Sequence, residues 1–164
     1  MVIIFFGGKD LVELENRNFV IAIGLDKNKK NDFELDILES NFDFFDKENN
    51  DNEKNVKVGI GKNFAGALKK IEEKSEKKIY LGHTQIIFMA NKFKQNKFLL
   101  KKIINELAKK NFVNQKIKIM FVEEPKKIIC KKFDSKFISF IRNKSHSKKF
   151  ITLHDLYEKI NGGS

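Results

Sequence analysis

The sequence predicts an α+β fold: a mixed, largely antiparallel sheet of about five strands flanked by helices. Its 164 residues are enough for one compact domain with a buried core. Hydrophobic residues make up 41% of the chain and include 17 Phe, which is more apolar mass than a disordered chain carries. Strand-like runs come first and then alternate with amphipathic helical segments, a pattern that favours a sheet covered by helices.

The first predicted pair of strands forms a hairpin. Residues 19–25 are a nearly continuous apolar run, typical of a strand buried on both faces. Residues 26–32 predict a turn, because Asn and Asp side chains accept hydrogen bonds from their own backbone. Apolar and polar residues alternate over 33–38, which predicts the second strand. Residues 47–55 contain no apolar side chain and predict an exposed loop.

Helices and strands alternate in the middle of the chain. Residues 56–60 predict a third strand, 79–89 a long fourth strand and 117–121 another. Between them, residues 98–110 form the clearest amphipathic helix, and a shorter helix is expected to begin after an N-cap at Asn63. The apolar face of that shorter helix consists of Phe64, Ala67, Leu68 and Ile71.

The two ends of the chain are less regular. Pro125 fits the first turn of a helix through Cys130, and two further short helices are expected at 135–142 and 152–160. Residues 10–18 predict a short helix or an extended lead-in. The apolar opening, residues 1–6, is either an edge strand or the remnant of a signal sequence, since a complete signal peptide has a longer apolar region behind a basic start.

The net charge of +11 raises the question of a polyanionic partner. Only Arg17 and Arg142 of the 33 basic residues are arginine, the residue whose planar fork reads bases, so no nucleic acid is expected. A solvated lysine surface, produced by an AT-rich coding sequence, explains the composition. The alternative is a real attraction to anionic lipid headgroups or to other polyanions.

Residues that could carry chemistry are sparse, and we expect no catalytic residue, no metal and no cofactor. The lone Cys130 excludes an internal disulfide, and we expect a buried structural thiol unless exposure leaves it reactive. The three histidines have no metal-ligand spacing, and His83 is expected to be a hydrogen-bonded structural residue. The stretch Gly59–Asn63 precedes a helix but lacks the second half of a phosphate-binding loop, and no Ser or Thr that could bind Mg²⁺ follows Lys62, so a tight turn explains its glycines.

Two segments resemble a known family. Residues 7–27 are similar to a pattern that runs Gly-Cys-Trp-Asp-x-x-Glu-Leu and then an apolar strand ending Gly-(Ile/Leu)-Asp-Lys. Residues 61–68 and 78–83 resemble the family's Gly-x-Thr-x-x-x-Ala-Leu and Leu-Tyr-x-Gly-His segments. The matching signature positions are Asp10, Glu13, Gly24, Asp26, Gly82 and His83. On these motifs the chain resembles the N-terminal domain of the Ger(x)C family, the C subunits of spore germinant receptors.

The resemblance implies a division of the chain and one departure from the family. Residues 1–18 would be a signal or lipobox remnant with a lead-in, and 19–164 the N-terminal domain, with the family's C-terminal domains absent. Gly8 stands where the family has a lipidated cysteine, and Lys9 replaces the usual Trp. Either the cysteine has been replaced or the chain is a divergent, unlipidated member. Without the lipid we expect the domain to be free in solution.

The function that the resemblance implies is that of a non-catalytic component of a nutrient germinant receptor. Family members are lipoproteins at the outer face of the spore inner membrane and act with the receptor's A and B membrane subunits. Gly24 and Asp26 are expected to end and turn a buried strand, and Gly82 with His83 to mark a close backbone approach and one buried hydrogen bond. The alternatives are a lysine-rich polyanion- or nucleic-acid-binding domain and a small hydrolase.

Overall fold

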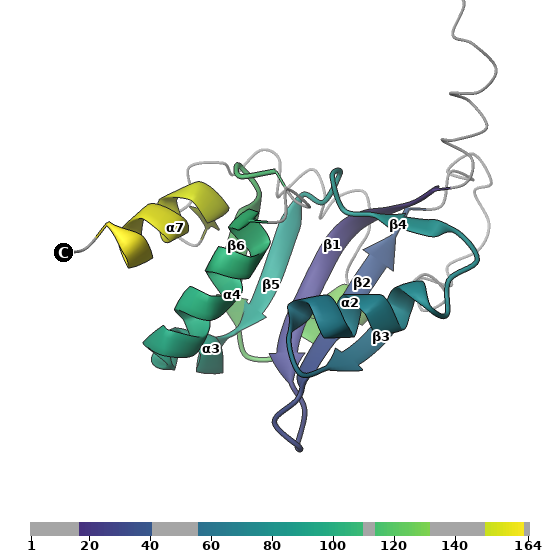
Figure 1. The fold of residues 1–164 in the computed structure, drawn as a ribbon, viewed down its shortest axis with the longest axis horizontal. Coiled ribbons are helices and arrows are strands. Elements are labelled where there is room, and N and C mark those ends of the chain that lie inside the picture. Colours follow the sequence, from purple (N-terminus) through teal and green to yellow (C-terminus); the bar gives the residue numbers. More distant parts are fainter. Residues whose placement is uncertain (1–16, 41–55, 110–113, 132–149, 163–164) are drawn as a thin grey trace, which may run out of the picture.

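The computed structural model describes residues 17–40, 56–109, 114–131 and 150–162. In this part of the chain seven strands form one sheet with helices on both faces (Figure 1). The strands are β1 (Arg17–Lys27), β2 (Phe33–Glu39), β3 (Val56–Gly61), β4 (Lys78–Tyr80), β5 (Ile86–Ala90), β6 (Lys118–Val122) and β7 (Ile151–Thr152). The helices are α2 (Phe64–Glu72), α3 (Asn91–Gln95), α4 (Lys97–Lys109), α5 (Pro125–Lys131) and α7 (Leu153–Asn161).

The sheet is mixed, as predicted, and the α+β class is confirmed. Its order is β3-β2-β1-β5-β6-β7, with β4 paired to the beginning of β1. The meander β1-β2-β3 and the pair β6-β7 are antiparallel, whereas β1 runs parallel to β4 and β5, and β5 parallel to β6. The described strands therefore number seven rather than about five, and antiparallel and parallel pairings are equally frequent among them.

Strand β1 is buried on both faces, as its apolar run predicts. Val20 and Ile23 belong to the core on one face of the sheet, and Ala22 to the core on the other. The register to β2 shifts between Val20 and Ala22, and this irregularity places Ile21 next to Ala22 on the same side. A bulge of this kind inserts one residue and thereby resets the alternation of side chains.

The larger core lies between the sheet and helices α2, α3, α4 and α7. Figure 1 shows α2 in front of β1–β3 and α4 in front of β5 and β6. The four residues predicted for the inner face of α2 are all buried, and Asn63 caps the helix by accepting a hydrogen bond from the Gly66 N–H. The buried residues of the other helices on this face are Phe93, Leu100, Ile103, Ile104, Leu107, Leu153 and Leu156.

The smaller core lies on the opposite face, under α5. Ile129 of α5 is fully buried against Ala22, Ile86 and Phe88. Cys130 is half-buried rather than buried, so the expectation of a buried thiol was wrong.

The hairpin between β1 and β2 is confirmed, and its turn has the predicted chemistry. The side-chain oxygen Asn28 Oδ1 accepts hydrogen bonds from the backbone N–H groups of Lys30, at 2.9 Å, and Asp32, at 3.0 Å. Asn31 has a φ of 66°, the left-handed conformation that Asn tolerates better than most residues.

One predicted strand is two strands in the structure. Residues 79–89 divide into β4 and β5, separated by a turn in which the Thr84 N–H donates to the Leu81 carbonyl at 3.0 Å. Both strands pair with β1, on either side of its bulge. Helix α3 and strand β7 were not predicted, because five and two residues are too few to show a periodic pattern. The predicted loop 47–55, the predicted helix 135–142 and residues 1–16 lie outside the described residues.

Candidate functional site

Gly24 allows α5 to approach the sheet. A Cβ atom built on Gly24 would lie 2.7 Å from Ile129 Cδ1, and 3.4 Å from Pro125 Cβ. Real Cβ atoms essentially never come within 3.0 Å of a heavy atom, so a side chain here would require Ile129 at least to shift. The expectation that Gly24 ends the strand was wrong, since β1 continues to Lys27. Its glycine is required by packing and not by backbone conformation.

Asp36 is a buried carboxylate that the sequence reasoning missed. It is opposite Gly24 in the β1–β2 register and has 0% exposure. Among the described residues neither oxygen has a hydrogen-bond partner. Burial raises the pKa of Asp36 from 3.8 to about 6, although Lys126 lowers it and Glu34 and Asp26 add to the rise. The alternation in residues 33–38 predicted a strand but did not indicate that α5 covers the face on which Asp36 lies.

The lysine nearest to this carboxylate is held by a different acid. Lys126 Nζ lies 2.9 Å from Glu34 Oε1, and both side chains are partly exposed. Hydrogen bonding to Glu34 raises the pKa of Lys126, with Asp36 contributing less. The cation therefore stabilises the rim of the contact between α5 and β2. The buried carboxylate has no hydrogen-bond partner, and the charge of Lys126 offsets only part of the effect of its burial.

Asp26 joins the end of β1 to α3. Asp26 Oδ1 accepts a hydrogen bond from the Lys27 N–H at 2.7 Å and lies 2.6 Å from Lys92 Nζ, which also donates to the Lys27 carbonyl at 2.9 Å. Asp26 thus links β1 to α3. The expectation that Asp26 turns the chain was wrong, since Asn28 makes that turn. Both side chains are partly solvated, so the pair contributes under about 1 kcal/mol.

Gly82 and His83 lie in the turn between β4 and β5. The Tyr80 ring folds over Gly82, where a Cβ atom would come within 2.6 Å of Tyr80 Cζ, so the expected close approach is present but involves a side chain. His83 is exposed, which corrects the expectation of a residue inside a strand with a buried hydrogen bond. Its ring contacts Phe19 and Tyr80, with centroid distances of 5.2 and 5.5 Å.

An aromatic cluster therefore marks the beginning of β1. Phe19 and Tyr80 meet edge to face at 5.6 Å, and the Arg17 guanidinium lies 5.3 Å from the centre of the Tyr80 ring. Such ring contacts add about 0.5–1.5 kcal/mol beyond burial. The cluster packs β4 and the turn after it against the beginning of β1, so its role is structural.

The N-terminus of α2 is occupied by protein groups. Its Gly66 N–H donates to Asn63 Oδ1 at 2.7 Å, and its Ala65 N–H donates to Glu106 Oε1 of α4 at 3.0 Å. A carboxylate in this position repels a phosphate. Gly59 and Gly61 of the same stretch lie against the α2 backbone at Ala67, which leaves no room for side chains. These contacts support the tight-turn interpretation of the glycines.

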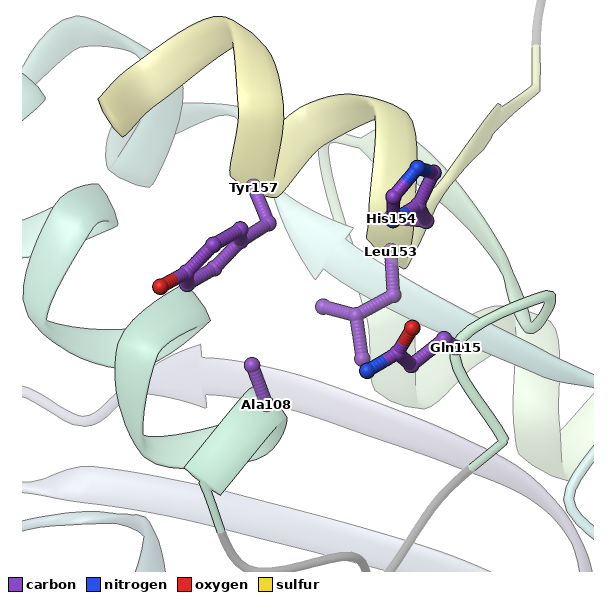
Figure 2. A pocket seen from close by; sticks show the side chains of 5 residues that line it. All are labelled: Ala108, Gln115, Leu153, His154 and Tyr157. Atoms are coloured by element: carbon purple, nitrogen blue, oxygen red, sulfur yellow. The ribbon is translucent and has the colours of Figure 1, made fainter. Parts of the chain in front are cut away.

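A small pocket lies between α4, α7 and the residues before β6. Ala108 and Leu153 line its apolar side, and Gln115, His154 and Tyr157 surround it (Figure 2). Its volume of about 190 Å³ is below the roughly 300–1,000 Å³ usual for ligand sites. In Figure 2 the Tyr157 hydroxyl points away from the His154 ring, so the two polar groups do not converge on one point.

The described residues offer neither a cluster of metal ligands nor a helix suited to a bilayer. They contain no group of three or more His, Cys, Asp or Glu side chains that could hold a metal ion. In the same part of the chain, no helix combines the length and the apolar character needed to cross a bilayer.

A model of a known protein family matches most of the chain. The family model described as the spore germination protein N-terminal domain matches residues 10–164. The chain belongs to this family. No curated protein and no solved structure matches it.

Membership in the spore germination protein N-terminal domain family confirms the resemblance drawn from the two motifs. Of the signature positions, Gly24 and Asp26 lie within β1 and Gly82 and His83 in the β4–β5 turn. They do not converge on one site. Asp10 and Glu13 lie outside the described residues, as does Gly8, and the expected boundary between residues 18 and 19 stays a prediction.

The sequence contained a signal for the missed Asp36. A strand as apolar as β1 must be covered on both faces. Its hairpin partner is then covered on both faces as well, at least where the two strands are paired. Any acid at the centre of β2 would therefore be buried, which applies to Asp36 and not to Glu34 at the end of the strand.

Proposed function

We propose that this chain is the N-terminal domain of a germinant receptor C subunit and acts in the nutrient response of spores as a non-catalytic component. The observation that carries the proposal is the family match, which extends over residues 10–164 and contains both motifs in order. The coarser conclusion, a domain of a spore germination protein, follows from membership itself.

The geometry of the matched residues supports a scaffold. Gly24 and Gly82 lie where side chains of the same domain come too close for a Cβ atom. The motif residues of the described chain are thus used to build the fold. The residues that line the pocket between α4 and α7 do not include a nucleophile in contact with a base, which argues against the small-hydrolase alternative.

The partners that we propose are the receptor's A and B membrane subunits, met at the outer face of the spore inner membrane. In the family an N-terminal lipid holds the C subunit at that face. Protein contacts would then transmit or stabilise the response, and no substrate would be turned over.

Site-specific photo-crosslinking in spores tests this proposal. A photoreactive residue would replace one exposed lysine on each of three elements, Lys69 of α2, Lys101 of α4 and Lys127 of α5. We expect crosslinks to A or B from one element and few from the other two, together with loss of the nutrient response when the domain is deleted. Absence of crosslinks from all three, in spores that respond normally without the domain, would refute the proposal.

A further inference from the structure

The exposed face of α4 combines one prominent aromatic residue with unpaired lysines. Phe98 is 82% exposed, far more than Ile60 at 47%, the other large apolar side chain that is exposed in the described chain. Lys101 and Lys102 follow Phe98 at the spacing that places residues on one helix face, and Lys97 precedes it. We call these four residues the Phe98 surface. The opposite face of α4 is buried in the larger core.

The positive charge of this surface is not neutralised by neighbouring acids. In the part of the chain that the structure describes, Lys97, Lys101 and Lys102 form no ion pair, whereas six other lysines do. Residues 91–109 contain six lysines and one acid, Glu106. Glu106 accepts a hydrogen bond from the backbone of α2 and is half-buried. The surface is therefore cationic around a solvated ring.

We propose that the Phe98 surface docks onto an anionic lipid bilayer, with the Phe98 ring inserted among the headgroups and the three lysines in contact with lipid phosphates. The inference goes beyond the receptor role and does not depend on it. Since the apolar face of α4 is buried in the core, the helix would not insert as a whole; its exposed lysines would attract anionic headgroups, and only the Phe98 ring would enter the interface. Each lysine near an anionic leaflet strengthens the association about fivefold.

Two other occupants fit this surface less well. A protein interface has an apolar centre from which lysine is depleted, whereas here three lysines adjoin a single ring on a convex helix. A nucleic acid would favour arginine for base and phosphate contacts, and the surface has none. A lipid surface requires only diffuse positive charge and a ring that can leave water, and both are present.

The absence of tryptophan from the chain permits a direct test. Phe98→Trp places a single fluorescent reporter in the surface, and Ile60→Trp is the matched control at an exposed apolar position of β3. With vesicles of phosphatidylglycerol and phosphatidylcholine, we expect emission from the first variant to shift to shorter wavelength and that from the second to stay unchanged. Vesicles of phosphatidylcholine alone should give neither shift.

Binding constants from vesicle sedimentation supply the second readout. Phe98→Ala should weaken binding roughly tenfold, since the variant lacks the favourable transfer of the ring's apolar area from water into the membrane. The pair Lys101→Glu with Lys102→Glu should weaken it at least about 25-fold, and about 1 M salt should abolish it by screening. The control pair Lys69→Glu with Lys74→Glu changes the net charge equally but lies on and after α2, so we expect a much smaller effect.

Three results would overturn the proposal. One is equal spectral shifts for the two tryptophan variants, and another is equal loss of binding for the two charge-reversal pairs. The third is binding to duplex DNA or polyglutamate that exceeds binding to anionic vesicles, which would assign the surface to a nucleic acid or to a protein. Crosslinking to the A and B subunits is measured independently, so failure here leaves the proposed receptor role standing.

Discussion

The buried carboxylate of Asp36 makes the stability of the domain depend on pH in a defined direction. Its pKa in the folded chain, about 6, lies above the ordinary value of 3.8. A raised pKa means that folding favours the protonated form, so stability is complete below about pH 4 and falls as the pH rises through 6. The difference of about two pKa units corresponds to about 3 kcal/mol at pH 8, since each unit is worth about 1.4 kcal/mol.

Asp36→Asn keeps the shape of the side chain and removes the charge. We expect the variant to be more stable than the parent at pH 8, and the difference between them to grow by about 2 kcal/mol from pH 4.5 to pH 8. Urea unfolding at several pH values, followed by circular dichroism, measures it. The control is Glu76→Gln, an exposed acid after α2, for which the difference should be small and nearly constant.

The outcome that refutes this reasoning is equally specific. If Asp36→Asn destabilises the domain at pH 8 as much as at pH 4.5, the carboxylate is ionised and has a compensating partner. Breaking a buried charge pair has that effect, typically of several kcal/mol. The interpretation of an uncompensated acid under α5 would then be wrong.

Three further predictions concern packing. Gly24→Ala should destabilise the domain by about 1–3 kcal/mol in urea unfolding, and Ile129→Val, which removes the clashing Cδ1 atom, should restore part of the loss; no restoration would contradict the clash. Gly59→Ala should destabilise the domain by more than about 3 kcal/mol, because the α2 backbone blocks the new methyl group. The control Gly66→Ala, whose new methyl group would lie nearest the Asn63 side chain, should change stability by less than about 1 kcal/mol. His83→Ala should cost less than about 1 kcal/mol in thermal unfolding, since the ring is exposed; a larger loss would restore the buried role first expected.

The sequence singled out several residues of the candidate site but did not show which contacts they make. The need for glycine at position 24 was visible, but its cause was not, because Ile129 lies more than a hundred residues later in the chain. His83 was expected to be buried because it sits within an apolar run. That run is interrupted by a turn opposite the bulge of β1, and the turn carries His83 to the surface.

Local patterns determined the elements of this protein. The apolar run at 19–25, the Asn28 turn and the spacing of Phe64, Ala67, Leu68 and Ile71 each express an interaction between near neighbours in the chain, so the sequence alone predicts them. Only the tertiary structure determined which polar residues are buried and which apolar residues remain exposed to solvent. Asp36 became buried because α5 packs across β2, and Phe98 stayed exposed because the core takes the other face of α4. Burial of this kind depends on contacts between distant segments, so the local alternation of residues 33–38 does not reveal it; for Asp36 it could be inferred only by combining that strand with the doubly buried β1 beside it.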